Sequence, residues 1–347
     1  MLHKRRISCA IICVACVCIV STLLWWARIY KSSIEQEHEF VTRRLENQSY
    51  ITALAFSPDS CKLAVGTDDS DIVIWDPRQG TKLTTLRGHG TSISSVAFSP
   101  EGSILVSSDW LAGVRIWNTQ TWATVDVLGG GLSSPVFTDL STDGQTLCFG
   151  PCKNLDTIAI WDVCKRRMKS TISTKGEPIL ALTLCENERE LLVVSGKKSA
   201  RIFELSTGNQ MLEFEVHREQ SQLDIYRVLR IPGGSQVIMF PLYDTSASIV
   251  DLRNLQGSRS INAPWEQLVG MAVSADGSTV ATIGGRGWYR AGELRLWDVE
   301  SGRMLTRISP KAESINTIAY SFDGTMIATG GIDGVVRIWD VDKVMAR

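Results

Sequence analysis

Histidines, cysteines and carboxylates are the side chains of this 347-residue chain that could perform acid–base, nucleophilic or metal chemistry. The four histidines, His3, His38, His89 and His217, lie far apart, so none pairs with a nucleophile in a recognisable triad. The nine cysteines do not form the two C-x2-C pairs of a zinc site. A Gly-x4-Gly-Lys phosphate loop is absent as well. We therefore expect no enzyme, no metal site and no cofactor.

Five of the cysteines lie beyond the N-terminal region, and an odd number disfavours a disulfide framework. We interpret them as buried small hydrophobic residues, the usual fate of a free cysteine in a packed sheet. One alternative stays open, because Cys148 and Cys152 flank Gly150-Pro151 in a predicted turn, where an oxidising compartment would permit a disulfide. The five are Cys61, Cys148, Cys152, Cys164 and Cys185.

The charge distribution argues against nucleic acid as a partner. Residues 1–31 hold five basic residues and no acid, so the rest of the chain carries a formal charge of −6. Nucleic-acid-binding domains carry a basic footprint instead. At 44% hydrophobic residues, the chain can bury a large core.

An aromatic residue followed by an acid or amide recurs along the chain at intervals of 42, 44, 42, 47, 47 and 42 residues, once the degenerate pair Val250-Asp251 is included. This period is typical of a four-stranded propeller blade. We therefore predict an all-β fold, a seven-bladed β-propeller of four-stranded antiparallel blades, preceded by one N-terminal transmembrane helix. The other pairs are Trp75-Asp76, Trp117-Asn118, Trp161-Asp162, Phe203-Glu204, Trp297-Asp298 and Trp339-Asp340.

The first complete unit shows the four expected strands, at residues 51–56, 62–67, 71–76 and 82–86, with turn-forming residues between them. The third strand of each unit is almost continuously apolar. Such a strand must be covered on both faces, which a blade packed between two neighbours provides.

These motifs resemble the WD-repeat (WD40) family over about residues 38 to 347. The resemblance rests on AFSPD (55–59) and AFSPEG (97–102), on Gly88-His89 and on the Trp-Asp pairs. It implies that a Trp, a strand Ser or Thr, a turn Asp and the Gly-His histidine form a hydrogen-bonded tetrad in each blade. The matching parts, none expected to be a complete set, are His89 with Trp117, Asp69 with Trp75, Thr329 with Asp333 and Trp339, and Asp244 in the fifth unit. The predicted structural blade marks are Trp75, Asp76, His89, Trp117, Trp161, Asp162, Trp297, Asp298, Asp333, Trp339 and Asp340.

The last unit ends without room for an outer strand. Residues 39–45 lie one inter-repeat distance before the first inner strand, so we expect them to supply it and close the ring, which removes exposed sheet edges. The predicted domains are 1–31, an anchor; 32–38, a linker; and 39–347, the propeller.

Residues 7–27 form an uncharged run that follows Lys4-Arg5-Arg6. At ~1.5 Å per residue a helix of this length spans a hydrocarbon core of ~30 Å. We interpret the run as an uncleaved signal anchor, with the lipid bilayer as a partner. Flanking positive charges favour an inside N-terminus, which places the propeller on the extracytoplasmic side of a single-pass membrane protein.

One face of the ring is the predicted interaction surface, because the turns between second and third strands all emerge on it. The sixth unit has an inserted turn rich in Arg, Trp and Tyr, the residues that dominate interface energetics. The alternative for Trp288 is to fold down and cap its own blade. The predicted interaction residues are Trp110, Lys197, Lys198, Tyr243, Arg286, Trp288, Tyr289 and Arg290.

The sequence therefore predicts a non-catalytic protein-interaction scaffold displayed from a membrane anchor. The alternatives are a small-ligand or peptide sensor, or an enzyme, that uses the channel mouth, and a structural component of an envelope complex.

Overall fold

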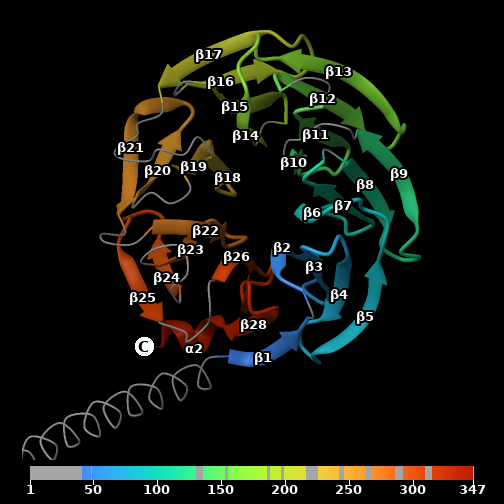
Figure 1. The fold of residues 1–347 in the computed structure, drawn as a ribbon. Helices are drawn as coiled ribbons and strands as arrows, with labels where there is room; N and C mark the ends of the chain where they lie inside the picture. Colours follow the sequence, from blue (N-terminus) through green and yellow to red (C-terminus); the bar gives the residue numbers. More distant parts are fainter. Residues whose placement is uncertain are drawn as a thin grey trace, which may run out of the picture.

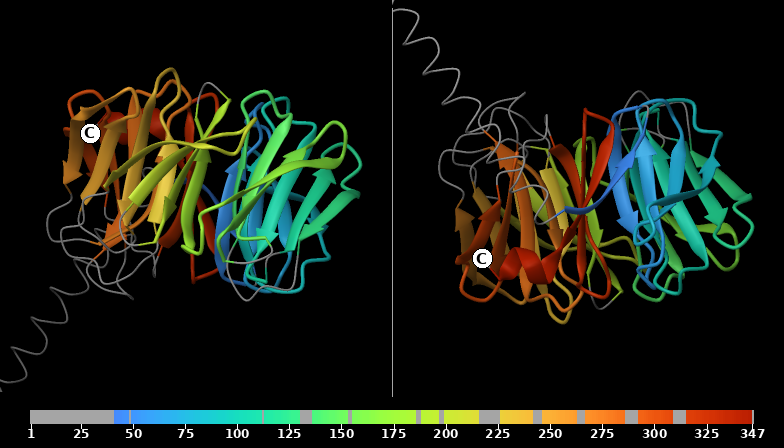
Figure 2. Two further views of the ribbon diagram at one scale, coloured as in Figure 1. Left: turned by 90° about the horizontal axis from the view of Figure 1, so that it is seen from above. Right: turned by 90° about the horizontal axis from the view of Figure 1, so that it is seen from below.

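The computed structural model shows seven blades arranged in a ring (Figure 1), and their inner strands line a central channel. Each blade is a four-stranded antiparallel sheet, and the side views show a flat disc (Figure 2). The predicted propeller is confirmed. The structure describes all residues except 1–40, 48, 112, 130–135, 153–154, 186–187, 197–198, 216–225, 242–245, 263–266, 286–291, 309–314 and 347.

The predicted membrane span, residues 7–27, lies outside the described residues. Among the residues that are described, no helix is both long and apolar enough to cross a bilayer.

We number the blades in chain order, and each runs from an inner strand beside the channel to an outer strand at the rim (Figure 1). Blade 1 contains β2 (Ile51–Phe56), β3 (Leu63–Thr67), β4 (Ile72–Asp76) and β5 (Thr81–Leu86). Blade 2 contains β6 (Ile93–Phe98), β7 (Ile104–Asp109), β8 (Gly113–Asn118) and β9 (Thr124–Gly129). Blade 3 contains β10 (Phe137–Leu140), β11 (Thr146–Gly150), β12 (Thr157–Asp162) and β13 (Arg167–Ser173). Blade 4 contains β14 (Ile179–Leu184), β15 (Glu190–Ser195), β16 (Ser199–Glu204) and β17 (Gln210–Glu215).

Blades 5 to 7 repeat this order. Blade 5 contains β18 (Tyr226–Arg230), β19 (Gln236–Pro241), β20 (Ser246–Asp251) and β21 (Asn254–Asn262). Blade 6 contains β22 (Gln267–Val273), β23 (Thr279–Gly285), β24 (Glu293–Asp298) and β25 (Met304–Ile308). Blade 7 contains β26 (Ile315–Tyr320), β27 (Met326–Gly331), β28 (Val335–Asp340) and, as its outer strand, β1 (Val41–Glu46).

The hydrophobic core lies between successive blades. Ile72 and Ile74 of blade 1, for example, belong to one cluster with Ile93 and Trp117 of blade 2. Close approach of the blades also explains why residue 66 is a glycine. A Cβ at Gly66 would lie only 2.6 Å from a methyl group of Ile93. The blade faces therefore pack as protein interiors do, and the continuously apolar third strands are covered on both sides.

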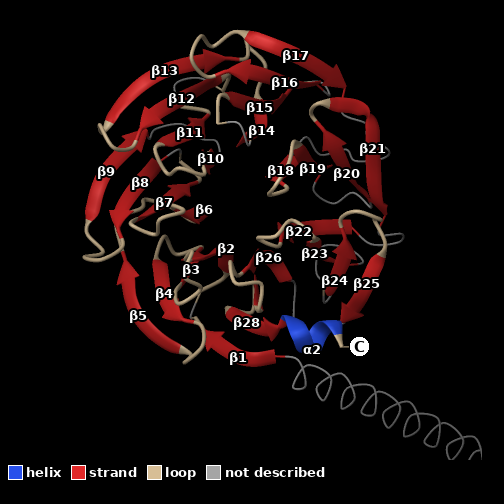
Figure 3. Cartoon of the chain, turned by 180° about the vertical axis from the view of Figure 1, so that it is seen from behind, coloured by secondary structure: helices blue, strands red, loops and turns tan. Residues whose placement is uncertain are grey.

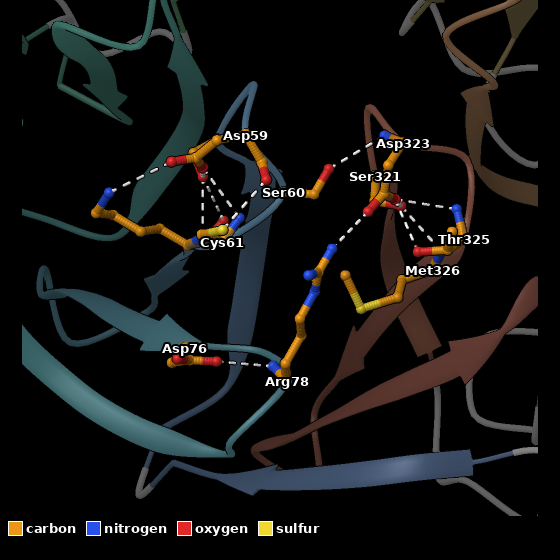
Figure 4. A network of polar contacts seen from close by, with 11 residues as sticks. Asp59, Ser60, Cys61, Asp76, Arg78, Ser321, Asp323, Thr325 and Met326 are labelled. Carbon is orange, nitrogen blue, oxygen red and sulfur yellow. Dashed lines mark hydrogen bonds and ion pairs between the residues drawn. The ribbon is translucent and has the colours of Figure 1, made fainter.

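Strand β1 closes the ring by pairing antiparallel with β28, so that the two ends of the propeller share blade 7 (Figure 1). Its Leu45 is 1% exposed and packs into the core beside blade 1. Polar contacts also join blades 7 and 1 (Figure 4): Arg78 Nη2 donates to Asp323 Oδ2 at 2.7 Å, and Asp323 N donates to Ser60 Oγ at 3.1 Å.

The chain continues past β28 as one short helix, α2 (Val341–Met345), at the rim between β25 and β1 (Figure 3). Asp340 caps its N-terminus by accepting a hydrogen bond from Lys343 N, and Val344 is buried against the core of blades 6 and 7. The residues for which the sequence left no strand therefore cover the edge of that core.

Candidate functional site

Blade 2 contains a complete tetrad of buried polar side chains. Trp117 Nε1 donates to Ser107 Oγ at 2.8 Å, and Ser107 Oγ lies 2.7 Å from His89 Nε2. His89 Nδ1 lies 2.9 Å from Asp109 Oδ2. The prediction that no unit has a complete set was therefore wrong for blade 2.

The tetrad uses His89 in its neutral form. If Nδ1 donates to the Asp109 carboxylate, then Nε2 accepts the hydroxyl proton of Ser107, and every polar group has a partner. Burial lowers the pKa of His89 and so favours this form. Burial alone would raise the pKa of Asp109, but hydrogen bonds from His89 and from the backbone N–H of Gly113 outweigh it and hold that pKa below its usual value.

Ser107 and Asp109 are the members that the sequence analysis missed. In blade 1 the turn aspartate Asp69 lies six residues before Trp75, whereas Asp109 lies eight residues before Trp117. The two hairpins have the same length, because Leu63 and Leu105 each lie 12 residues before the tryptophan that they face. Asp109 instead stands two positions earlier than Asp69, at the end of its strand, where blade 1 has Thr67.

The strand register explains which other tryptophans have partners. The residue two positions beyond the strand neighbour of the Trp faces the indole. This facing residue is Thr282 for Trp297 and Thr329 for Trp339, and each hydroxyl accepts a hydrogen bond from the indole N–H at 2.8 Å.

Two other tryptophans have no such partner. The facing residue is Val65 in blade 1 and Phe149 in blade 3, and the indole nitrogens of Trp75 and Trp161 are buried without a partner. Asp333 does not join such a set, since it pairs with Arg337 at 2.8 Å.

Val65→Thr is expected to raise the free energy of unfolding by about 1 kcal/mol, because its hydroxyl would accept the unpaired indole N–H of Trp75. Urea denaturation measures the effect. The matched control is Val193→Thr, at the equivalent position of blade 4, where Phe203 offers no donor. Val193→Thr should lower the free energy of unfolding by about 1 kcal/mol or more, because its hydroxyl would be buried without a partner. An equal effect of both changes would contradict the assignment of position 65 as the one that faces the indole N–H of Trp75.

The aspartates of the Trp-Asp pairs act as caps for the turns to the outer strands. Asp76 Oδ1 accepts from the backbone N–H of Arg78 and Gln79 at 2.9 and 2.8 Å. Asn118 does the same in blade 2, which explains why an amide replaces the acid there. These residues, with Asp162, Asp298 and Asp340, are therefore structural and offer no free carboxylate pair for catalysis.

The tetrad of blade 2 also holds an exposed apolar turn. Asp109 Oδ1 accepts from the backbone N–H of Leu111 at 3.0 Å and of Gly113 at 2.9 Å. Between these anchors, Trp110 and Leu111 are each 47% exposed. The turn is therefore rigid at its base and presents two large apolar side chains to solvent.

Trp110 is the one predicted interaction residue among those that the structure describes. The others, Lys197, Lys198, Tyr243, Arg286, Trp288, Tyr289 and Arg290, lie outside the described residues. Two further apolar side chains share the face of Trp110: Tyr50 directly before β2 and Leu155 between β11 and β12, each 54% exposed. They share it because alternate strands of a blade run in opposite directions.

A cavity of about 680 Å³ lies at the centre of the ring and opens on the opposite face. Its walls come from inner strands of blades 2 to 7, and its mouth from the turns that follow them, which include Pro100, Thr142 and Phe322. The sequence analysis did not locate this site, because its wall combines single residues from many blades.

An ion pair connects three blades in the cavity wall. Arg230 Nη2 of blade 5 lies 3.6 Å from Asp139 Oδ1 of blade 3. Asp139 Oδ2 accepts from Thr183 Oγ1 and Leu184 N of blade 4, both at 2.8 Å. The carboxylate is thus fully engaged, whereas Nη1 of Arg230 is buried without a partner.

None of the five cysteines in the described part of the propeller forms a disulfide bond. Cys148 and Cys185 are buried as predicted, but Cys61 and Cys164 are exposed, so their predicted burial was wrong. Burial raises the pKa of the Cys185 thiol to about 12, which leaves it unreactive. Among the residues that the structure describes, no three His, Cys, Asp or Glu side chains gather as metal ligands.

Seven four-stranded blades define a seven-bladed β-propeller, and its Trp–Ser–His–Asp tetrad and turn-capping Trp-Asp pairs resemble those of WD-type repeats. Two family models match parts of the chain: "WD domain, G-beta repeat" matches residues 302–340, and "Nucleolar protein 10-like, N-terminal domain" matches residues 27–134.

Three curated relatives match over most of the chain. Periodic tryptophan protein 2 of Arabidopsis thaliana is 23% identical over 86% of the chain, which spans 30% of that protein. Eukaryotic translation initiation factor 3 subunit I of Aspergillus oryzae is 22% identical over 84% of the chain and 92% of its own length. Pre-rRNA-processing protein crb3/ipi3 of Schizosaccharomyces pombe is 23% identical over 82% of the chain and 54% of its own length. The chain resembles non-enzymatic WD-repeat proteins, as the sequence predicted.

The predicted localisation is contradicted by these relatives. They are named for translation initiation and pre-rRNA processing, which take place inside the cell. An extracytoplasmic propeller on a single-pass membrane protein was therefore a wrong prediction, and no comparison supports the lipid bilayer as a partner.

Proposed function

We propose that the chain is a non-catalytic protein-interaction scaffold, a subunit of a larger assembly, that binds a partner protein through the face carrying Trp110. The observation that carries the proposal is the exposure of Trp110 and Leu111 on a turn that Asp109 fixes. Exposed aromatic side chains on a rigid base are typical anchors of protein interfaces. Relatives named as an initiation-factor subunit and a pre-rRNA-processing protein support membership of an assembly.

The proposed face extends beyond this turn. Tyr50 and Leu155 add apolar surface on the same side of the disc. We include in the proposed surface the seven predicted interaction residues outside the described part, because the repeat pattern of the sequence predicts turns of this side at their positions. Their aromatic and arginine side chains are of the types enriched in interface anchors.

The double change Trp110→Ala and Leu111→Ala is expected to weaken partner binding about thirtyfold or more, the effect of losing one interface hot spot. Stability should change little, because both side chains are about half exposed. The measurement is affinity capture from the native cell lysate, followed by binding titration of each captured protein.

The matched control is Met211→Ala, which removes an equally exposed apolar side chain from outer strand β17 at the rim. It should leave the captured set unchanged. A photo-crosslinking residue placed at position 110 should form adducts that the same residue at position 127 on β9 does not. Equal capture by the double variant and the parent would refute the proposed face.

A further inference from the structure

The central cavity holds an arginine without a counter-ion. Arg227 on β18 lines both the 680 Å³ cavity and a smaller one of about 160 Å³ deeper in the channel. Among the described residues, nothing accepts a hydrogen bond from its guanidinium or forms an ion pair with it. Figure 1 shows β18 at the inner edge of blade 5, facing the centre of the ring.

Arg227 is an exposed residue, and it lines the two cavities of the channel. The surrounding walls desolvate the guanidinium, and this alone lowers its pKa. Arginine nevertheless keeps its charge in proteins. The guanidinium therefore presents its positive charge and its N–H donors to the cavity, where a ligand can reach them.

The other charges in the described wall do not pair with Arg227. Asp139 is satisfied by Thr183, Leu184 and Arg230, so its charge is already balanced. Arg230 contributes a second unsatisfied donor, the buried Nη1. The described lining therefore carries one net positive charge and two sets of N–H donors without acceptors.

The apolar residues of the cavity wall favour an apolar group in the uncharged part of a ligand. Apolar side chains from six blades line the same cavity, among them Phe98, Phe137, Leu182, Leu229 and Met271. A volume of 680 Å³ accommodates a small molecule or a few side chains of a peptide. One positive charge between apolar walls matches a monoanion, and a planar carboxylate matches the forked donors of a guanidinium.

We propose that the central cavity binds a carboxylate carried next to an apolar group, with the Arg227 guanidinium as its anchor. The carboxylate comes either from a free small molecule or from an acidic side chain within an apolar segment of a partner. This site is independent of the proposed function, since it opens on the face opposite Trp110. A variant that loses binding at the central cavity should therefore keep partner binding at the Trp110 face, and the reverse should hold as well.

Two pairs of probes distinguish the sources on the full chain. The first pair is octanoate and octanamide, and the second is the peptide acetyl-Leu-Glu-Leu-amide and its Gln counterpart. Calorimetric titration should show the carboxylate of at least one pair binding about tenfold or more tightly than its amide. The tighter probe should also raise the melting temperature, because it binds the folded state alone.

Arg227→Met is expected to abolish this preference for carboxylate while leaving the melting temperature about unchanged, because the exposed guanidinium has no described partner to lose. Arg227→Lys keeps the charge but lacks the fork, so it should bind the carboxylate with intermediate affinity. Arg303→Met, which changes an exposed arginine next to β25, is the matched control and should bind as the parent does.

Preference for octanoate would identify a free small molecule as the ligand, and preference for the Glu peptide a partner segment. Equal binding of carboxylate and amide in both pairs would overturn the proposal. So would a carboxylate preference that Arg227→Met retains. If that variant fails to fold, the probe pairs on the parent and the intermediate affinity of Arg227→Lys still decide the outcome.

Discussion

Deletion of residues 41–46, which form β1, is expected to lower the melting temperature by about 10 °C or more. Without β1, strand β28 would become an open sheet edge, and the core beside blade 1 would lose Leu45. Blades 7 and 1 would keep the apolar contacts of their remaining strands and the polar contacts of Asp323 with Arg78 and Ser60. Differential scanning calorimetry of the deletion variant measures the loss.

A point change isolates the packing contribution. Leu45→Ala should lower the free energy of unfolding by about 2–5 kcal/mol, since this side chain is 1% exposed. Glu46→Ala, which alters the exposed neighbour on the same strand, should change stability by less than about 0.5 kcal/mol. A deletion variant that melts with the parent would show that β1 does not hold the ring closed.

His89→Ala is expected to lower the free energy of unfolding by about 2–3 kcal/mol at pH 7.5. The change removes the partner of both Ser107 and Asp109 in a site where the histidine side chain is 1% exposed. Two polar groups would then be buried with incomplete hydrogen bonding. Urea denaturation followed by tryptophan fluorescence measures the effect.

The effect of His89→Ala on the free energy of unfolding should depend on pH. Burial lowers the pKa of folded His89 below its ordinary 6.5, so the unfolded chain takes up the proton first as the pH falls through about 6.5. Protonation therefore favours the unfolded state, and the stability that neutral His89 confers is complete above this pH and is lost below it. The difference between parent and His89→Ala should narrow from pH 7.5 to pH 5.5.

Thr329→Val is the control for this pH effect. It removes the acceptor of Trp339 Nε1 in blade 7, where no described histidine takes part. It should lower stability by about 1–2 kcal/mol at both pH values. A His89→Ala difference that stays constant with pH would contradict the assignment of a neutral histidine.

The fold was predictable because its signal repeats. Apolar third strands and Trp-Asp pairs recur in phase, and each independent repeat reduces the chance that the pattern is accidental. The predicted strands of blade 1 agree with β2 to β5 within one residue. Turn chemistry was local too, since Asp76 and Asn118 cap the turns in which they stand.

The tetrads were less predictable, because they depend on register and turn length. Ser107 meets Trp117 only because Leu105 is the strand neighbour of that tryptophan. The same rule leaves Trp75 without a partner, since Val65 occupies the position in blade 1. Sequence spacing shifts with every inserted turn residue, whereas the strand ladder does not.

By itself, the sequence determined the number of blades, their strands and the absence of a recognisable catalytic set, because these follow from periodic patterns along the chain. Only the tertiary structure decided which residues meet across the ring. Arg227 reads in the sequence as an ordinary strand arginine, and Asp139 and Arg230 stand 91 positions apart in the chain. Closure of the ring brings them to one cavity wall, since every blade contributes its inner strand to the same channel, and the unpaired charge of Arg227 exists only there.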